Sequence, residues 1–130
     1  MASFRDLDIY KLAFEYSIDI HRLSMELPRF ELYEQGSQIR RSSKGIKDAI
    51  AEGYGRKSYK QDFIKYLIYA QASCDETLNH LETIVVLYPE LKKFSEFIPK
   101  YQQLGKMINK FIGYVEEKWN NLSEPEPNHL

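Results

Sequence analysis

The stretch from Ser58 to Pro89, SYKQDFIKYLIYAQASCDETLNHLETIVVLYP, decides the fold class. Its apolar positions recur in alternating steps of four and three residues, the spacing of one face of an α-helix. This spacing predicts a long amphipathic helix that Ser58 and Gln61 open as a capping box and Pro89 ends. The positions that form the apolar row are Phe63, Leu67, Ala70, Cys74, Thr77, Leu81, Ile84 and Tyr88.

Three other segments show the same spacing. The first spans residues 8–27 and ends before Pro28, and the second spans residues 37–53. The last contains Pro99, so it either begins near Ile98 or continues a short, bent helix, and it runs toward residue 122. No alternation typical of strands occurs. Four amphipathic helices with short connections predict an all-α, antiparallel up-down-up-down four-helix bundle.

The second segment carries unusually small residues along its apolar row. Ser43 and Gly53 belong to this row, which indicates a helix that can approach its neighbour closely. Gly45 costs ~1 kcal/mol relative to alanine inside a helix, so we interpret it as a residue tolerated for close packing. Gly53 and Gly55 are expected to end the helix with positive φ angles.

Length and composition indicate a single globular domain. The chain has 130 residues, 43% of them hydrophobic, and a net charge of −1. These values exclude an intrinsically disordered chain and a histone-like basic protein. We expect one domain over residues 1–122 and a disordered, proline-containing tail over residues 123–130. No signal-like or membrane-length apolar run occurs and cysteine is used once, so we expect a cytoplasmic protein.

The sequence provides no catalytic, metal or cofactor motif. Ile18 and Thr77 stand three residues before His21 and His80, so neither histidine completes the Glu-x-x-His motif that holds the di-iron sites of some bundles. Glu76 and His80 lie one turn apart without a third ligand, and we interpret them as a solvated pair. Cys74 belongs to the apolar row and is expected in the core. Gly53-Tyr54-Gly55 lacks the third glycine and the preceding strand of a dinucleotide site.

Positive charge is concentrated in the middle of the chain. Residues 36–65 hold eight basic and three acidic residues, whereas the segments on either side are each net negative. Arg41 projects toward the side of Asp48 and Glu52, so we interpret it as structural. The other basic residues are the candidate contacts to nucleic acid: Arg40, Lys44 and Lys47 along one side of the second helix, then Arg56, Lys57 and Lys60 through the following turn.

Tyr54 and Tyr59 are interleaved with these basic residues and are candidate stacking surfaces for unpaired bases. A second interpretation fits the same pattern, namely a solvated helix face whose charges serve solubility. The cluster therefore indicates a polyanion without identifying one.

Several motifs resemble one protein family. They are the run Ile50-Ala51-Glu52-Gly53-Tyr54-Gly55-Arg56, the run Ser37-Gln38-Ile39-Arg40-Arg41, the opening Phe4-Arg5-Asp6-Leu7, the Leu27-Pro28 turn, and Phe63 with Leu67, Ala70, Ser73 and Glu76. Together they resemble the four-helix bundle family of 23S rRNA intervening-sequence proteins, over residues 4–88 and only in pattern beyond. Ala49 and Ala72 depart from an asparagine and a glycine common in that family.

The resemblance carries expectations about assembly and partners. Members of the family are small bacterial proteins, many encoded within sequences that interrupt 23S rRNA genes, and relatives are accessory proteins of diversity-generating retroelements. The resemblance implies a four-helix protomer that assembles into a homopentamer. It also implies RNA or a reverse transcriptase as partner.

The first helix independently favours self-association, because a second apolar row runs beside its main row. That row comprises Tyr10, Phe14, Ser17 and His21, and we expect it to be buried against another subunit. Two hypotheses follow. The protein is a non-enzymatic, RNA-associated homo-oligomer without cofactors; alternatively, it is a structural oligomer that binds a protein partner such as a retroelement reverse transcriptase.

Overall fold

The computed structural model describes residues 2–119, and this part of the chain contains helices and no strand. The predicted all-α class and the four helices are therefore confirmed. The elements are the 3₁₀ helix η1 (Phe4–Asp6), α1 (Asp8–Ser24), the 3₁₀ helix η2 (Arg29–Tyr33), α2 (Gln35–Gly55), α3 (Lys60–Leu87) and α4 (Lys93–Lys118).

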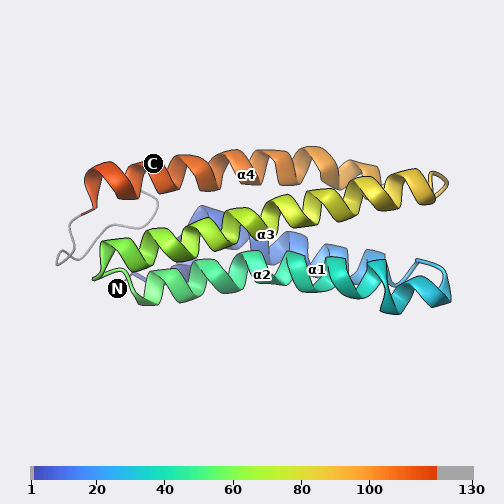
Figure 1. Ribbon diagram of the computed structural model, residues 1–130, viewed down its shortest axis with the longest axis horizontal. Helices are drawn as coiled ribbons and strands as arrows, with labels where there is room; N and C mark the ends of the chain where they lie inside the picture. Colours follow the sequence, from blue (N-terminus) through green and yellow to red (C-terminus); the bar gives the residue numbers. More distant parts are fainter. Residues whose placement is uncertain (1, 120–130) are drawn as a thin grey trace.

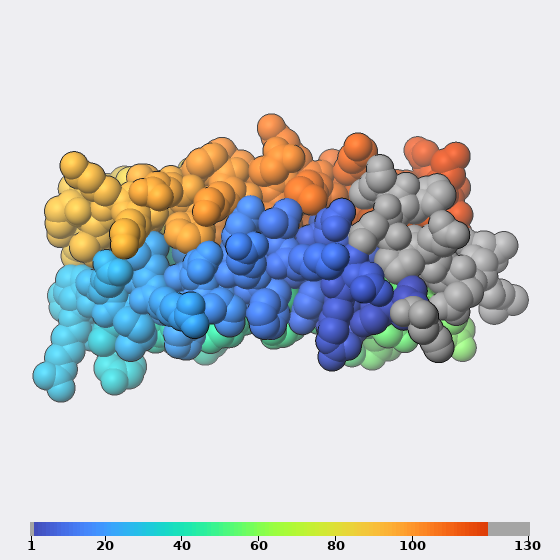
Figure 2. Space-filling view, turned by 180° about the vertical axis from the view of Figure 1, so that it is seen from behind, coloured from blue at the N-terminus to red at the C-terminus, as the bar shows by residue number. Residues whose placement is uncertain are grey.

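The four α-helices form an antiparallel bundle in which each helix packs against the next along the chain (Figure 1). The first and last helices, α1 and α4, also contact each other, which completes the bundle. Figure 2 shows this closure from behind, with α1 lying against α4. The α2–α3 turn lies at one end of the bundle, and η2 lies at the other with the α3–α4 turn. This arrangement is the up-down-up-down topology that short connections favour.

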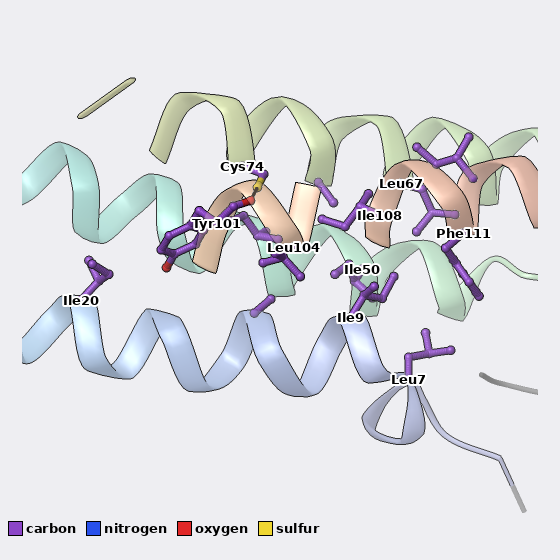
Figure 3. Close-up of a cluster of buried hydrophobic side chains, with 14 of the residues drawn as sticks. Leu7, Ile9, Ile20, Ile50, Leu67, Cys74, Tyr101, Leu104, Ile108 and Phe111 are labelled. Carbon is purple, nitrogen blue, oxygen red and sulfur yellow. Dashed lines mark hydrogen bonds between the residues drawn. The ribbon is translucent and has the colours of Figure 1, made fainter. Parts of the chain in front are cut away.

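Apolar side chains from all four helices meet along the bundle axis (Figure 3). Phe63 of α3 makes edge-on ring contacts with Phe111 and with Trp119, at 5.9 and 4.9 Å between centroids. The Trp119 indole nitrogen donates to the Lys57 carbonyl at 2.8 Å, which fastens the end of α4 to the α2–α3 turn. Aromatic packing therefore closes this end of the core.

Cys74 lies in the core, as its position in the apolar row predicts. Its thiol donates to the Tyr101 carbonyl of α4 at 3.3 Å. Burial, and secondarily the charge of Asp75, raise the pKa of this thiol to about 12. The residue is therefore a protonated packing group at neutral pH and not a nucleophile.

Several helix boundaries differ from the sequence expectations. α1 ends at Ser24, before Leu27, and α3 begins at Lys60 after Tyr59, so the capping box at Ser58 does not form. α4 begins at Lys93 and runs through Pro99. Proline has no backbone N–H to donate to the carbonyl four residues earlier, here that of Ser95. Both residues are exposed, so water can satisfy that carbonyl and the helix continues.

Glycines let α2 approach a neighbouring helix closely, as the sequence predicted, and the structure identifies that neighbour as α3. A methyl group at Gly45 would lie 3.1 Å from Ser73 Oγ, and one at Gly53 would lie 2.9 Å from Tyr66 Cβ. The expected positive φ angles at Gly53 and Gly55 are wrong, because α2 stays helical through Gly55. Gly53 is required for close packing and not for chain reversal.

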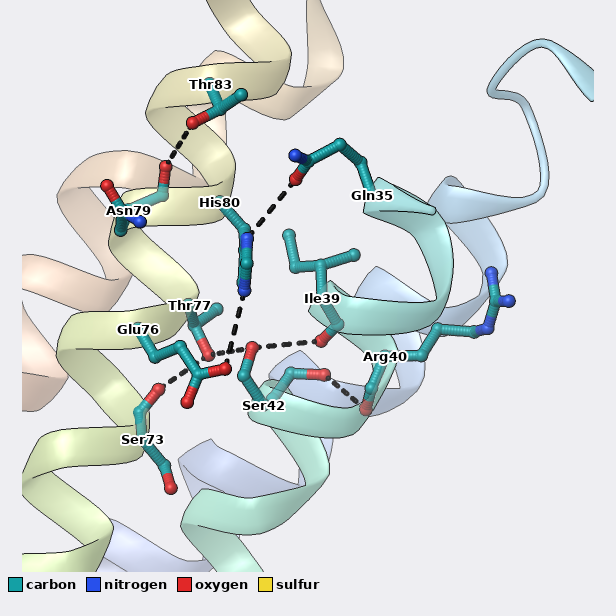
Figure 4. Close-up of polar contacts among 11 residues, drawn as sticks. Gln35, Ile39, Arg40, Ser42, Ser73, Glu76, Thr77, Asn79, His80 and Thr83 are labelled. Atoms are coloured by element: carbon teal, nitrogen blue, oxygen red, sulfur yellow. Dashed lines mark hydrogen bonds and ion pairs between the residues drawn. The ribbon is translucent and has the colours of Figure 1, made fainter. Parts of the chain in front are cut away.

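A polar seam runs between α2 and α3 beside the glycines (Figure 4). The Thr77 hydroxyl donates to Ser42 Oγ at 2.9 Å, and both groups are buried. His80 lies 3.2 Å from Gln35 Oε1 and 3.5 Å from Glu76 Oε2. Hydrogen bonds of this kind each contribute about 1 kcal/mol and also fix the register of the two helices.

The predicted disordered tail, residues 123–130, lies outside the described residues. Within residues 2–119, none of the helices combines the length and apolar character that crossing a membrane requires.

The glycine contacts predict opposite effects of one substitution at two places. Gly53→Ala should lower the free energy of unfolding by about 1 kcal/mol, because overpacking costs ~1–3 kcal/mol and exceeds the gain in helix propensity. Gly113→Ala, in α4 with open space around its Cβ, should raise it by up to about 1 kcal/mol. Urea denaturation of both variants measures the difference. Equal stabilities would contradict a packing role for Gly53.

Candidate nucleic-acid interface

Arg40 fastens the connection between α1 and α2. Its Nη1 donates to Ser24 Oγ at 2.9 Å, and its Nη2 donates to the Leu32 carbonyl at 2.6 Å. Gly36 makes room for this contact, since a Cβ there would lie 3.0 Å from Arg40 Nη1. Figure 4 shows the side chain extending away from α3. The guanidinium therefore joins α1, η2 and α2.

Arg41 is the exposed arginine of the pair. It forms no hydrogen bond or ion pair within residues 2–119, so the expected balance with Asp48 and Glu52 is wrong. The structure thus exchanges the roles assigned from the sequence. Arg40, a predicted nucleic-acid contact, uses its donors inside the protomer, and Arg41 presents its charge to solvent.

Lys44 and Lys47 lie on the edge of α2 that faces α1. Lys44 Nζ donates to His21 Nδ1 at 2.8 Å. Desolvation first, and then the charges of Lys44, Arg40 and Arg22, lower the pKa of His21, which keeps the ring neutral and able to accept. Lys47 Nζ lies 2.6 Å from Asp48 Oδ1 and 5.9 Å from the centre of the Phe14 ring. Both lysines are half-buried with their ammonium groups near the surface.

The α2–α3 turn places three more predicted cations close together. Arg56 forms ion pairs with Glu52 at 3.4 Å and Asp62 at 3.8 Å, and its guanidinium lies over the Tyr66 ring. Lys57 Nζ lies 4.3 Å from the centre of the Tyr54 ring. Lys60 begins α3 and is half-buried. The turn is therefore a cationic surface in which the charge of Arg56 is partly balanced by Glu52 and Asp62.

The two predicted stacking tyrosines lie in different environments. Tyr54 is only 4% exposed and packs edge-on against Phe63, so its assignment as a stacking surface is wrong. Helical projection places Tyr54 at the edge of α2, but it does not show that α4 and Trp119 close over this end. Tyr59 is exposed, and its role as a stacking surface stays a prediction.

Sequence reasoning missed a second group of aromatic and basic side chains on α3. Tyr66 and Tyr69 contact each other edge-on at 5.4 Å, and Lys65 Nζ lies within 6.0 Å of both ring centres. With Arg56 over Tyr66, these residues form what we call the tyrosine patch: Arg56, Lys65, Tyr66 and Tyr69. The signal was available, because Lys65 and Tyr69 lie outside the apolar row of α3.

The structure corrects the expected solvated pair of Glu76 and His80. His80 is only 7% exposed and belongs to the seam between α2 and α3. In the described part of the chain, no three His, Cys, Asp or Glu side chains are grouped as a metal site would require.

The different environments of Arg40 and Arg41 predict different effects on stability. Arg40→Ala should lower the free energy of unfolding by about 2 kcal/mol, because hydrogen bonds from a charged donor contribute ~1.5–3 kcal/mol. Arg41→Ala should change it by no more than about 0.5 kcal/mol, as an exposed residue without partners. Denaturant midpoints of the two variants provide the measurement. A larger loss for Arg41→Ala would restore the assignment made from the sequence.

Comparison with known proteins identifies the family. The family model described as 23S rRNA-intervening sequence protein matches residues 5–110, from η1 into α4. Comparisons with curated proteins and with solved structures returned no match. The matched segment contains all of the candidate basic residues as well as the tyrosine patch, and the family is not known as an enzyme family. The chain therefore belongs to the family of 23S rRNA-intervening sequence proteins.

Proposed function

We propose that this protein is a non-enzymatic RNA-binding homo-oligomer of the bacterial cytoplasm. The observation that carries the proposal is the set of basic side chains that residues 36–65 bring to the surface of α2 and the α2–α3 turn. We exclude Arg40 from this set because its guanidinium donates hydrogen bonds within the protomer, and we include Arg41 because it is exposed. The proposed phosphate contacts are Arg41, Lys44, Lys47, Arg56, Lys57 and Lys60.

Phosphate contacts explain why such a surface suits a protein with a net charge of −1. Each lysine or arginine that neutralises a phosphate releases counterions, so local charge determines affinity and net charge does not. Acidic partners hold two of these side chains in place: Asp48 pairs with Lys47, and Glu52 and Asp62 pair with Arg56. They also weaken each contact, and repetition of the surface in an oligomer would restore useful affinity.

Exposed apolar side chains support self-association. Phe14 on α1 is 45% exposed, whereas Ser17 of the same predicted row is fully buried within the protomer. On α3, Ile68 and Val86 are exposed. A ring requires two different surfaces on each subunit. Exposed apolar side chains occur on both α1 and α3, and these two helices do not pack side by side in the bundle. We propose a pentameric ring.

The assembly proposal predicts a mass of about five times 15.4 kDa in solution. Phe14→Lys should reduce this mass while leaving the helical circular dichroism unchanged, because a buried charge opposes association and Lys47, whose Nζ lies 5.9 Å from the Phe14 ring, cannot neutralise it. Tyr33→Ser, at an exposed position of η2, is the matched control and should leave the mass unchanged. Light scattering at micromolar concentration measures all three proteins. A monomer mass for the parent protein would contradict the proposal.

The RNA proposal predicts a loss of salt dependence. Replacing Arg41, Lys44 and Lys47 together by Gln should weaken binding to a structured RNA. The slope of log K against log salt should become shallower by about 2 to 3, because each lost phosphate contact removes ~0.7 in a single strand and ~0.9 in a B-form duplex. The control replaces Lys93, Lys106 and Lys110 of α4, which are exposed, with the same loss of charge. Anisotropy titrations at two ionic strengths provide both slopes.

Two outcomes would count against RNA binding. If the parent protein binds no RNA at low salt, the alternative partner, a protein such as a retroelement reverse transcriptase, replaces RNA. If both triple variants lose the same affinity, general charge explains the binding and the surface of α2 does not.

A further inference from the structure

The tyrosine patch contains two aromatic rings, and one of them, that of Tyr69, is not part of the hydrophobic core. Tyr69 is 48% exposed, and Ile68 beside it is exposed as well. Neither residue belongs to the hydrophobic cluster that the four helices share. An exposed aromatic ring with an ammonium group beside it, here that of Lys65, is a candidate contact surface.

The geometry of the patch is fixed by its neighbours. Tyr66 packs over Gly53 of α2, where an added Cβ would lie 2.9 Å from Tyr66 Cβ. Arg56 lies 4.9 Å above the Tyr66 ring, and its ion pairs with Glu52 and Asp62 hold it there. Tyr66 in turn meets Tyr69 at an interplanar angle of 84°. The Tyr69 ring is thus supported on one side and open to solvent on another.

Lys65 adds a charge that the protomer does not neutralise. Its ammonium group lies near both rings, and within residues 2–119 it forms no ion pair with a carboxylate. A cation beside an exposed ring suits a ligand that carries a flat apolar surface next to a negative group. A nucleotide with an unpaired base and its phosphate has this chemistry.

We propose that the tyrosine patch is a stacking site for unpaired bases of single-stranded RNA, with a base on Tyr69 and the adjoining phosphate at Lys65. The assignment rests on the RNA association proposed above and gives that site its ligand class. Bases in a duplex are already stacked on each other, and the deep groove of A-form RNA excludes side chains. Tyrosine stacking tolerates any sequence, because every base has a π face.

The test compares two labelled RNAs of equal length, an unstructured single strand and a fully paired duplex, by anisotropy with the full chain. The parent protein should prefer the single strand. Tyr69→Ala should weaken single-strand binding about 10-fold without changing the salt slope, because stacking releases no counterions. Tyr69→Trp should bind as the parent does. Lys65→Gln should make the slope shallower by about 0.7.

Tyr33→Ala is the matched control, since Tyr33 is 80% exposed but lies in η2 at the other end of the bundle. It should bind like the parent. Light scattering on every variant reports the assembly state, so that a change in mass is separated from a change in RNA contact.

The possible failures are distinguishable. If Tyr69→Ala binds the single strand as tightly as the parent protein does, the stacking site is overturned while RNA association stands. Equal affinity for duplex and single strand would overturn the ligand class. A reduced mass for Tyr69→Ala would make the patch a contact between copies of the chain, and it would overturn the assignment. No binding of either RNA would remove the proposed function together with this site.

Discussion

The close approach of α2 and α3 is the constraint on which the rest of the structure depends. A Cβ would lie 3.1 Å from Ser73 Oγ at Gly45 and 2.9 Å from Tyr66 Cβ at Gly53, so both positions are tight. The Thr77 to Ser42 hydrogen bond fixes the register where the helices meet. Packing of this kind allows little relaxation, because protein interiors are close to their maximum density. The same contact sets where Tyr66 lies, so the register of the core determines the geometry of the surface.

A second fixed point lies at the opposite end, where η2 connects α1 to α2. Arg40 joins the three elements, and the Tyr88 hydroxyl donates to the buried Glu31 carboxylate at 2.7 Å. That hydrogen bond, with desolvation, raises the pKa of Tyr88 to about 12. Polar side chains thus organise the connection, since a chain reversal leaves backbone groups that helices do not satisfy. Arg40 shows that a basic residue in this region can have a structural role, so a basic residue alone is not evidence of an RNA contact.

Periodicity alone was sufficient to predict the fold class and the core row of α3, including Cys74, because burial repeats with the helical period. It also predicted that Gly45 serves close packing. It could not assign Arg40 and Arg41, since a helical projection gives a direction but not the segment that occupies it; η2 lies beside Arg40. Tyr54 was misplaced for the same reason, because its burial depends on Phe63 and on the distant end of α4.

The tyrosine patch shows how one helix serves both stability and recognition. The apolar row of α3 faces the core, and Tyr69 with Lys65 lies outside it. Tyr66 connects the two regions, because it contacts both Tyr69 and the backbone at Gly53. A substitution at Tyr66 would therefore disturb the packing of α2 and α3 together with the surface. Tyr69 and Lys65 are separable from the core, so they are the positions at which recognition can be examined without loss of the fold.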